Sequence, residues 1–160
     1  MGFFSKDGAV TAIGDAPRPL SRDRIKQILE QLEVTYSVDS DADIGAGWEE
    51  GSFFFLVEGQ SEELLCVRGQ WRGRLTAGEY PEAVMACNEW NQQTRWPKTY
   101  ARESEGSVFL NAELNVDLEG GVTDTQLRQQ LQCVIATGLD FFEKLNTKFP
   151  AAWEQYRPQA

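Results

Sequence analysis

The stretch from Ser107 to Leu118 constrains the fold more than any other part of this chain, because its hydrophobic residues alternate without a break. Apolar side chains occupy every even position from 108 to 118, and the odd positions carry Phe109, Asn111, Glu113, Asn115 and Asp117. Successive strand residues point to opposite faces of a sheet, so this period of two predicts a long strand. One sheet face is therefore expected to pack on a core while the other faces water, as antiparallel sheets allow.

Four other segments have the composition of strands, namely residues 34–39, 53–57, 64–72 and 98–103. The connection between the second and third of these segments, residues 58–63, is short. A parallel return needs a dozen or more residues, so neighbouring strands are expected to run antiparallel. Residues 39–51, between the first two strands, are acidic and contain glycines, and they are predicted to form a loop. The sequence thus predicts an antiparallel sheet of about five strands.

Helical signals occur before, between and after these strands. Ser21 is suited to cap a first helix, and Pro81 fits the first turn of a second helix, which Pro97 brings to an end. Thr123 and Gln126 have the spacing of a capping box at the start of a long third helix. The resulting order, α-β-β-β-α-β-β-α, predicts an α+β domain with helices packed on one face of the sheet.

The chain of 160 residues is long enough for one hydrophobic core. We expect a single domain over residues 20–149, preceded by an N-terminal arm at 1–19 and followed by a short C-terminal tail at 150–160. The arm contains prolines and glycines and has little apolar periodicity. The longest apolar runs are too short to cross a bilayer, so no membrane partner is expected.

Composition limits both the partners and the chemistry of the chain. Twenty-five acidic and fifteen basic residues give a net charge of −10, which repels nucleic acid and anionic membrane surfaces. The chain has no histidine, so histidine-based triads and dyads cannot form within it. Cys66, Cys87 and Cys133 form no CxxC pair, which excludes a zinc ribbon or a thioredoxin-type site. We therefore assign no catalytic residue and no cofactor, and reduced cysteines fit a cytoplasmic location.

The acidic segment at residues 39–50 is the main candidate for a metal site. Asp39, Asp41, Asp43 and Glu50 stand at positions 1, 3, 5 and 12 of a calcium loop of the EF-hand kind. Ile44, however, occupies the position at which such a loop needs glycine, and the flanking segments are predicted strands. A calcium site and an ordinary solvated acidic turn are therefore both open, and no metal ligand is assigned firmly.

Five residues are candidates for binding a partner or a ligand. Trp90, Asn91, Trp96 and Lys98 surround the end of the second helix and combine aromatic bodies with polar groups, as binding pockets do. Phe109 is an apolar exception on the polar face of its strand, and an incompletely covered sheet face is a candidate partner surface. The structural alternative places Trp90 in the core and uses Asn91 to satisfy backbone groups where the helix ends.

The polar face of the sheet is also predicted to carry opposite charges on neighbouring strands. Arg68 and Arg72 belong to one strand, and Glu113 and Asp117 belong to the long alternating strand. Opposite charges on adjacent strands stabilise a sheet, so the sequence predicts cross-strand pairing of these arginines with these acids. Phe54 is a second apolar residue expected on this face.

Several motifs, taken in order, resemble those of one bacterial family. They are Asn88-Glu-Trp-Asn91, Arg95-Trp96-Pro97-Lys98, the turn Asp117-Leu-Glu-Gly-Gly-Val-Thr123 and the pair Phe141-Phe142. From about residue 20 to residue 145 the chain resembles the YbjN family, whose members are labelled sensory transduction regulators. The resemblance implies a fold similar to that of the type III secretion chaperones, and such folds commonly dimerise and bind other proteins.

Together, the composition and the resemblance predict a non-enzymatic cytoplasmic protein that binds another protein. Its expected role is that of an adaptor or chaperone-like regulator in bacterial signalling or stress response. A homodimer and an unidentified protein partner are expected. The family label brings no catalytic or ligand-binding residue to these positions. The alternative from another class is a sensor module that binds a small ligand or calcium.

Overall fold

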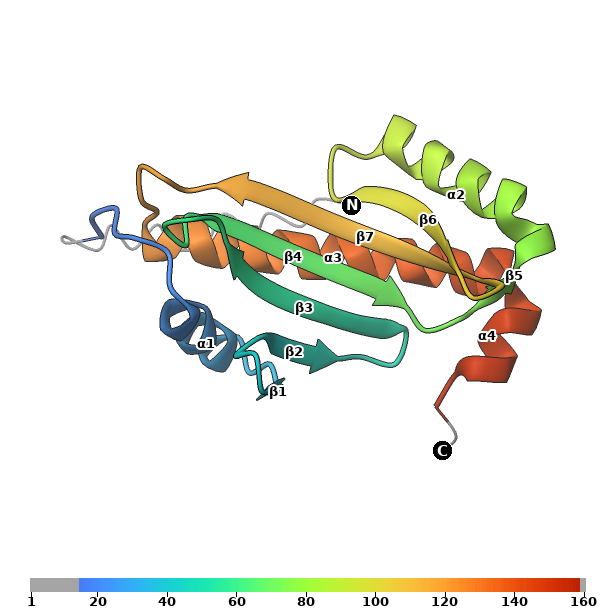
Figure 1. Cartoon of the computed structure of the whole chain (residues 1–160), viewed down its shortest axis with the longest axis horizontal. Helices are drawn as coiled ribbons and strands as arrows, with labels where there is room; N and C mark the ends of the chain where they lie inside the picture. The colour runs from blue at the N-terminus through green and yellow to red at the C-terminus, as the bar shows by residue number, and fades with distance from the viewer. Residues whose placement is uncertain (1–14, 159–160) are drawn as a thin grey trace, which may run out of the picture.

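The computed structural model describes residues 15–158, which form a curved sheet with helices packed against it (Figure 1). In chain order the elements are α1 (Arg22–Gln31), β1 (Tyr36–Val38), β2 (Ile44–Gly47), β3 (Gly51–Glu58), β4 (Leu64–Trp71), β5 (Leu75–Thr76), the 3-10 turn η1 (Ala77–Glu79), α2 (Tyr80–Gln93), β6 (Lys98–Ser104), β7 (Ser107–Asp117), α3 (Asp124–Lys148) and α4 (Pro150–Tyr156). Of the predicted arm at 1–19, positions 1–14 lie outside the described residues.

The sheet has seven strands, and every neighbouring pair runs antiparallel. The order across the sheet is β1-β2-β3-β4-β7, with β6 paired to β7 and the two-residue β5 paired to the start of β7. These pairings confirm the predicted α+β class and the antiparallel sheet. The predicted number of about five strands is too low, because β2 and β5 give no clear signal in the sequence.

The strand β2 lies inside the acidic segment 39–51, for which the sequence predicts a loop. Ile44 and Ala46 are buried against β3, while the two glycines that alternate with them are not. A strand of four residues that is half glycine is too short and too poor in β-prone residues to be recognised. Its pairing with β1 on one side and β3 on the other makes it a strand, so that part of the prediction is corrected.

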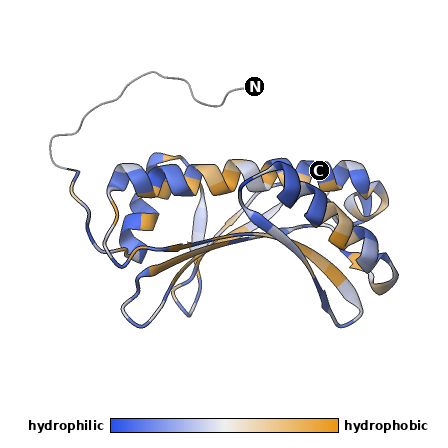
Figure 2. Ribbon diagram, turned by 90° about the horizontal axis from the view of Figure 1, so that it is seen from above, coloured by the Kyte–Doolittle hydropathy of each residue, from blue (hydrophilic) through white to orange (hydrophobic). Residues whose placement is uncertain are grey.

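The helices α1, α2 and α3 lie on one side of the sheet, and much of their hydrophobic surface faces the strands (Figure 2). The predicted placement of the helices on one face is therefore confirmed. Burial of this surface removes apolar area from water, which is the main favourable contribution to folding. Within residues 15–158, no helix is long and apolar enough to cross a membrane.

Phe53 of β3 is a fully buried residue in a slot between the sheet and α3. Glycines form two walls of this slot: a Cβ at Gly69 would lie 2.5 Å from the Phe53 ring, and a Cβ at Gly138 would lie 2.7 Å from it. Phe142 of α3 packs on the ring at a centroid distance of 5.5 Å. Because any larger side chain would overlap the ring, the two glycines set how closely α3 approaches the sheet.

The helix ends follow the predicted caps. The Thr123 hydroxyl accepts a hydrogen bond from the Gln126 amide at 3.1 Å, and the Gln126 side chain accepts one from the Thr123 amide at 3.1 Å, which completes the capping box. Ser21 caps α1 through a hydroxyl–amide hydrogen bond of 3.3 Å. Pro81 lies in the first turn of α2, and the helix ends ahead of Pro97 as predicted.

The segment before α1 is fastened to the start of α3. The Asp15 carboxylate accepts hydrogen bonds from the backbone amides of Asp124 and Thr125 at 2.8 and 3.0 Å. Hydrogen bonds from Thr125, together with the Asp124 amide, lower the pKa of Asp15 to about 2. The buried guanidinium of Arg24 pairs with Asp124 at 2.7 Å. A carboxylate at a helix N-terminus satisfies free amides, so Asp15 acts as a cap supplied from outside the helix.

Candidate functional site

The sheet face opposite the helices, which we call the open face, carries outward-pointing side chains from four strands. Its central residues are Phe54, Leu56, Leu64, Cys66, Arg68, Lys98, Tyr100, Arg102, Phe109, Asn111, Glu113 and Asn115. The strand register sets Phe54, Arg68, Glu113 and Lys98 opposite one another in a single row. Side chains directly opposite on adjacent strands start about 5 Å apart, so the members of this row interact directly.

Glu113 is nearly enclosed by its neighbours and is only 7% exposed. Its carboxylate accepts hydrogen bonds from Arg68 Nε at 2.8 Å, Lys98 Nζ at 2.8 Å, Tyr100 OH at 2.9 Å and Asn115 Nδ2 at 2.8 Å. Burial alone would raise the pKa of this carboxyl, but the four hydrogen bonds, led by that from Lys98, outweigh burial and lower the pKa to about 2. Glu113 is therefore ionised at neutral pH and orders the side chains around it.

Of the two predicted cross-strand charge pairs, that of Arg68 with Glu113 is confirmed and that of Arg72 with Asp117 is wrong. The pairing of β4 with β7 ends before Arg72, and it sets Asp117 opposite Leu64 at the other end of β4. Arg72 instead donates to two backbone carbonyls of the turn between β2 and β3, each at 2.7 Å. Arg72 lies beyond the last paired residue of β4 and β7, so it binds the nearby turn instead of an acid on β7. The sequence does not show where this pairing ends.

Beside the charged row, the open face has an apolar strip made of Phe54, Leu56 and Leu64. Phe54 is 41% exposed and Leu64 is 37% exposed, and Leu56 is half-buried. Cys66 lies opposite Leu56, and burial together with the Glu113 charge raises the pKa of its thiol. A protonated thiol is a poor nucleophile, so this part of the open face is suited to contact rather than to reaction.

Phe109, predicted to face outward, is flanked by two arginines. The guanidinium carbons of Arg102 and Arg74 lie 5.3 and 5.5 Å from the centroid of its ring, which is within cation–π range. Arg102 stands opposite Phe109 on β6, and Arg74 lies in the connection between β4 and β5. Sequence reasoning did not place either arginine at Phe109. The alternation of Lys98, Tyr100 and Arg102 is the signal that places Arg102 on the open face.

The structure divides the five predicted recognition residues between the two sides of the sheet. Trp90 lies on the helix side, where it is 6% exposed and packs on Phe141 at a centroid distance of 5.3 Å. The Asn91 side chain donates to the Thr99 carbonyl and accepts from the Thr99 amide, both at 3.0 Å. Asn91 thereby fastens the edge strand β6 to the end of α2, as the structural alternative for these residues proposes.

The other three predicted residues are not gathered into one pocket. Lys98 is held by Glu113 on the open face, where Phe109 also lies. Trp96 is 44% exposed and borders an open hollow of about 570 Å³ with residues 91–95. The predicted set is therefore divided among three places: Trp90 in the core, Asn91 and Trp96 at the hollow at the end of α2, and Lys98 and Phe109 on the open face.

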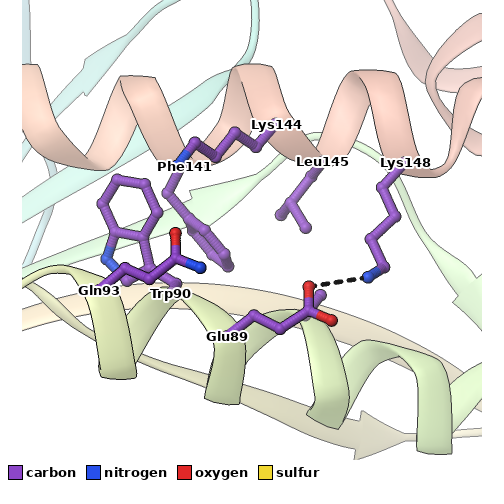
Figure 3. Close-up of a pocket in the computed structure, with 8 residues that line it drawn as sticks. Glu89, Trp90, Gln93, Phe141, Lys144, Leu145 and Lys148 are labelled. Atoms are coloured by element: carbon purple, nitrogen blue, oxygen red, sulfur yellow. Dashed lines mark hydrogen bonds and ion pairs between the residues drawn. The ribbon is translucent and has the colours of Figure 1, made fainter.

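A smaller groove of about 100 Å³ lies between α2 and α3 (Figure 3). Trp90 and Phe141 supply apolar lining, and Glu89 and Lys148 form an ion pair of 3.0 Å across it (Figure 3). The Lys144 amine lies 4.7 Å from the Trp90 ring. Pockets that bury small ligands measure roughly 300–1,000 Å³, so this groove is a packing gap between helices.

The carboxylates of the candidate calcium loop do not converge. The strand β2 lies between Asp43 and Glu50 and separates Glu50 from the aspartates. The Asp39 carboxylate accepts from the amides of Asp41 and Asp43 at 2.9 Å each, which is a turn capped by its own first residue. Among residues 15–158, no group of three or more Asp, Glu, Cys or His side chains is placed to hold a metal ion. The geometry matches the solvated acidic turn.

The remaining cysteines are also poor nucleophiles. Burial raises the pKa of Cys87 to about 11, and burial raises the pKa of Cys133 as well. Thiols with raised pKa values stay protonated at neutral pH and react slowly. What the described residues offer is an ordered, charged and partly apolar surface, which is equipment for binding.

These features define an α+β domain with helices on one face of an antiparallel sheet and an open face on the other. The YbjN family model, described as "Putative bacterial sensory transduction regulator", matches residues 21–147. The chain therefore belongs to the YbjN family, and the resemblance noted in its motifs is confirmed.

A crystal structure of YbjN from E. coli, described as "a putative transcription regulator", has the same fold. It matches with a TM-score of 0.71 at 10% sequence identity, and the alignment covers 90% of this chain and 100% of that chain. No curated protein matches the chain. The likeness to type III secretion chaperones stays a prediction.

Proposed function

We propose that this chain is a non-enzymatic regulator that binds a protein partner on its open face. The apolar strip of Phe54, Leu56 and Leu64 carries the proposal, because no helix in the described part of the chain covers it (Figure 2). Single exposed apolar residues are ordinary, but neighbouring ones beside ordered polar side chains are typical of an interface. The family's description as a sensory transduction regulator supports a role exerted through another molecule.

The charged row prepares this surface for binding. Because Glu113 already holds Arg68 and Lys98, these long side chains lose little further conformational freedom when a partner docks. Apolar contact on the strip supplies affinity, and the ordered charges favour one orientation of the partner. An adaptor or chaperone-like role in the cytoplasm, in signalling or stress response, belongs to the same proposal. The three free cysteines support that location.

Affinity capture from an extract of the producing cells tests the proposal, with Phe54→Ser as the variant and Val38→Ser as its control. Val38 is 44% exposed, about as much as Phe54, but it is paired with Ile44 on the core side of the edge strand β1. A protein that binds the wild type and Val38→Ser but not Phe54→Ser is expected. A partner that Phe54→Ser retains, or the recovery of the chain alone, overturns the proposal.

We propose further that the chain forms a homodimer through the outer side of α2. Three large apolar side chains of this helix are exposed there: Tyr80 at 37%, Val84 at 42% and Met85 at 60%. In a two-fold dimer the same apolar patch serves both protomers, so one exposed helix can cover itself. Light scattering is expected to give twice the chain mass for the wild type and a single mass for Met85→Lys. A monomeric wild type contradicts the dimer.

A small-ligand sensor is the second candidate function, and the hollow beside Trp96 is the observation that favours it. At about 570 Å³ it has the volume of a ligand site, although it is open to solvent. A ligand stabilises the folded state by mass action, so a thermal-shift screen that includes calcium tests this candidate. A rise in melting temperature that Trp96→Ala removes supports it. A flat screen removes it from consideration.

A further inference from the structure

At one end of the sheet, the start of β7, the strand β6 and the helix α4 come together beside β5 (Figure 1). Two exposed arginines lie against aromatic rings there. The Arg102 guanidinium is 5.3 Å from the Phe109 ring, and that of Arg74 is 5.5 Å from Phe109 and 5.4 Å from Tyr156. Arg102 approaches Phe109 from the strand β6, and Arg74 approaches it from the connection between β4 and β5. We call these two residues the arginine pair.

The arginine pair keeps its hydrogen-bonding edges available. A guanidinium that stacks on an aromatic ring uses its flat face and leaves its N–H donors pointing outward in its own plane. Neither arginine takes part in the ion pairs that join residues within 15–158. The aromatic rings therefore hold the two guanidinium groups in place and leave the N–H donors of both groups available to bind an acceptor.

The local charge around the arginine pair is opposite to that of the chain as a whole. Arg68 and Lys98 share the carboxylate of Glu113, and Arg74 and Arg102 lie at Phe109, four positions away along β7. The acids Glu58 and Asp117 flank Leu64 at the other end of the open face, so cations predominate between Phe109 and Glu113. The whole chain, in contrast, has a net charge of −10. A positive region on an acidic protein attracts negative groups locally and is complementary to an acidic surface.

We propose that the arginine pair anchors an acidic segment of the protein partner, so that Arg74 and Arg102 each bind a carboxylate; this rests on the proposed function of the open face. Planar guanidiniums match carboxylates with two parallel N–H to O bonds, and that geometry gives direction as well as attraction. The anchor lies on the same face as the apolar strip. A segment that alternates acidic and apolar side chains can therefore engage both, because an extended chain shows every second residue to one side.

The size of the positive region distinguishes an acidic peptide from a nucleic acid. A nucleic acid carries a continuous run of phosphates, which the acidic remainder of this chain repels. A short acidic segment brings its charges only to the arginine pair and its neighbours. The commitment is therefore to a protein segment, and binding of nucleic acid is an outcome that the test must detect.

Fluorescence anisotropy with the full chain tests the proposal. The probe is a labelled synthetic peptide in which glutamate alternates with leucine and phenylalanine. Two comparison probes are the same peptide with lysine in place of glutamate and a single-stranded oligothymidylate of equal charge. We expect binding of the acidic peptide only, and we expect it to weaken as salt is raised because the contacts are exposed charges.

Arg102→Gln, Arg74→Gln and Arg102→Lys are the variants, and Arg128→Gln is the control. Arg128 bonds Gln31 in the helix layer, so its loss removes an equal charge from the other side of the sheet. Each glutamine variant is expected to weaken peptide binding about fivefold, the upper end for one exposed charge pair. Arg102→Lys keeps the charge but loses the planar guanidinium, so its affinity for the peptide should lie between that of the wild type and that of Arg102→Gln. Circular dichroism of each variant confirms that the fold is intact.

The outcomes separate this proposal from the function on which it rests. No binding of the acidic peptide, or equal loss with Arg128→Gln, overturns the anchor. If a captured partner still depends on Phe54, the proposed function survives that result and only the acidic anchor fails. If the partner is indifferent to Phe54, the open face itself fails as a binding surface. Equal or tighter binding of the oligothymidylate overturns the assignment to an acidic protein segment.

Discussion

Replacing Glu113 by glutamine removes the one anion that four neighbouring side chains share, while it keeps the shape of the side chain. In the wild type the carboxylate accepts from Arg68 and Lys98 at 2.8 Å each and is 7% exposed. In Glu113→Gln those two cations face a neutral amide. The NH₂ group of that amide is a hydrogen-bond donor, and it lies against side chains that are themselves donors. Leaving charged groups without a counter-charge costs more than the lost hydrogen bonds alone. We therefore expect a clear loss of stability.

The magnitude follows from the lowered pKa of Glu113. Each tenfold change in proton affinity corresponds to about 1.4 kcal/mol. Lowering the pKa from 4.5 to about 2 stabilises the folded state by roughly 3 kcal/mol if the partners are unscreened. The Arg68 and Lys98 side chains are 45% and 58% exposed, so solvent screening reduces the expected loss to about 2 kcal/mol.

Urea unfolding followed by tryptophan fluorescence measures this loss, and its pH dependence tests the cause. Because the folded-state pKa lies below the ordinary value, the stabilisation is fully present above pH 4.5 and is lost as the pH falls through about 2. The free energy of unfolding of Glu113→Gln should thus lie about 2 kcal/mol below that of the wild type at neutral pH. The difference should shrink in acid.

Glu105→Gln is the matched control, because Glu105 is exposed in the turn between β6 and β7 and makes no ion pair with a described residue. We expect its unfolding curve to match that of the wild type. A difference between Glu113→Gln and the wild type that is the same at neutral and acid pH would refute the reasoning. It would show that the loss comes from packing and not from the charge.

Three further changes probe the fold. Asn91→Ala removes three hydrogen bonds between Asn91 and Thr99 and should lower the free energy of unfolding by about 1–2 kcal/mol in urea. Gly138→Ala places a methyl group against the Phe53 ring and should cost about 1–3 kcal/mol, measured as a lower melting temperature. Asp15→Asn should speed amide hydrogen exchange in the first turn of α3. It should also remove a stabilisation that the wild type has above pH 3.8 and loses towards pH 2.

Two of these three changes have a control within the chain, and the third has an outcome that contradicts it. Gly47→Ala meets open space and should be neutral, so equal losses at Gly47 and Gly138 would contradict the Phe53 slot. Asn115→Ala removes a single hydrogen bond and should cost less than Asn91→Ala. If exchange in the first turn of α3 is the same in Asp15→Asn as in the wild type, Asp15 is not the cap of that helix.

Part of this architecture is visible in short stretches of sequence. The alternation in β7, the capping box at Thr123 and the proline signals around α2 are local, because strand period and cap chemistry depend on residues within a few positions. They suffice for an α+β domain with helices on one face. They also identify Phe54 and Phe109 as apolar residues on a polar face. The family motifs lie along this same framework.

Local sequence patterns predicted only part of the candidate site. The pair of Arg68 with Glu113 follows from alternation on two strands that were predicted to be neighbours, and it is confirmed. The predicted pairing of Arg72 with Asp117 is wrong because the pairing of β4 with β7 ends before Arg72. The register between two strands cannot be predicted from the sequence of either strand alone. The calcium spacing was a local pattern as well, but β2 forms within it and separates the carboxylates.

The sequence by itself therefore determined the layers of this protein, the ends of its helices and which strand residues face outward. Tertiary structure decided what those outward residues do. Arg74 and Arg102 are far from each other along the chain, and only the pairing of β5 and β6 with β7 brings both to Phe109. Local patterns arise from backbone geometry over a few residues, whereas a binding surface depends on contacts between segments that no local pattern records.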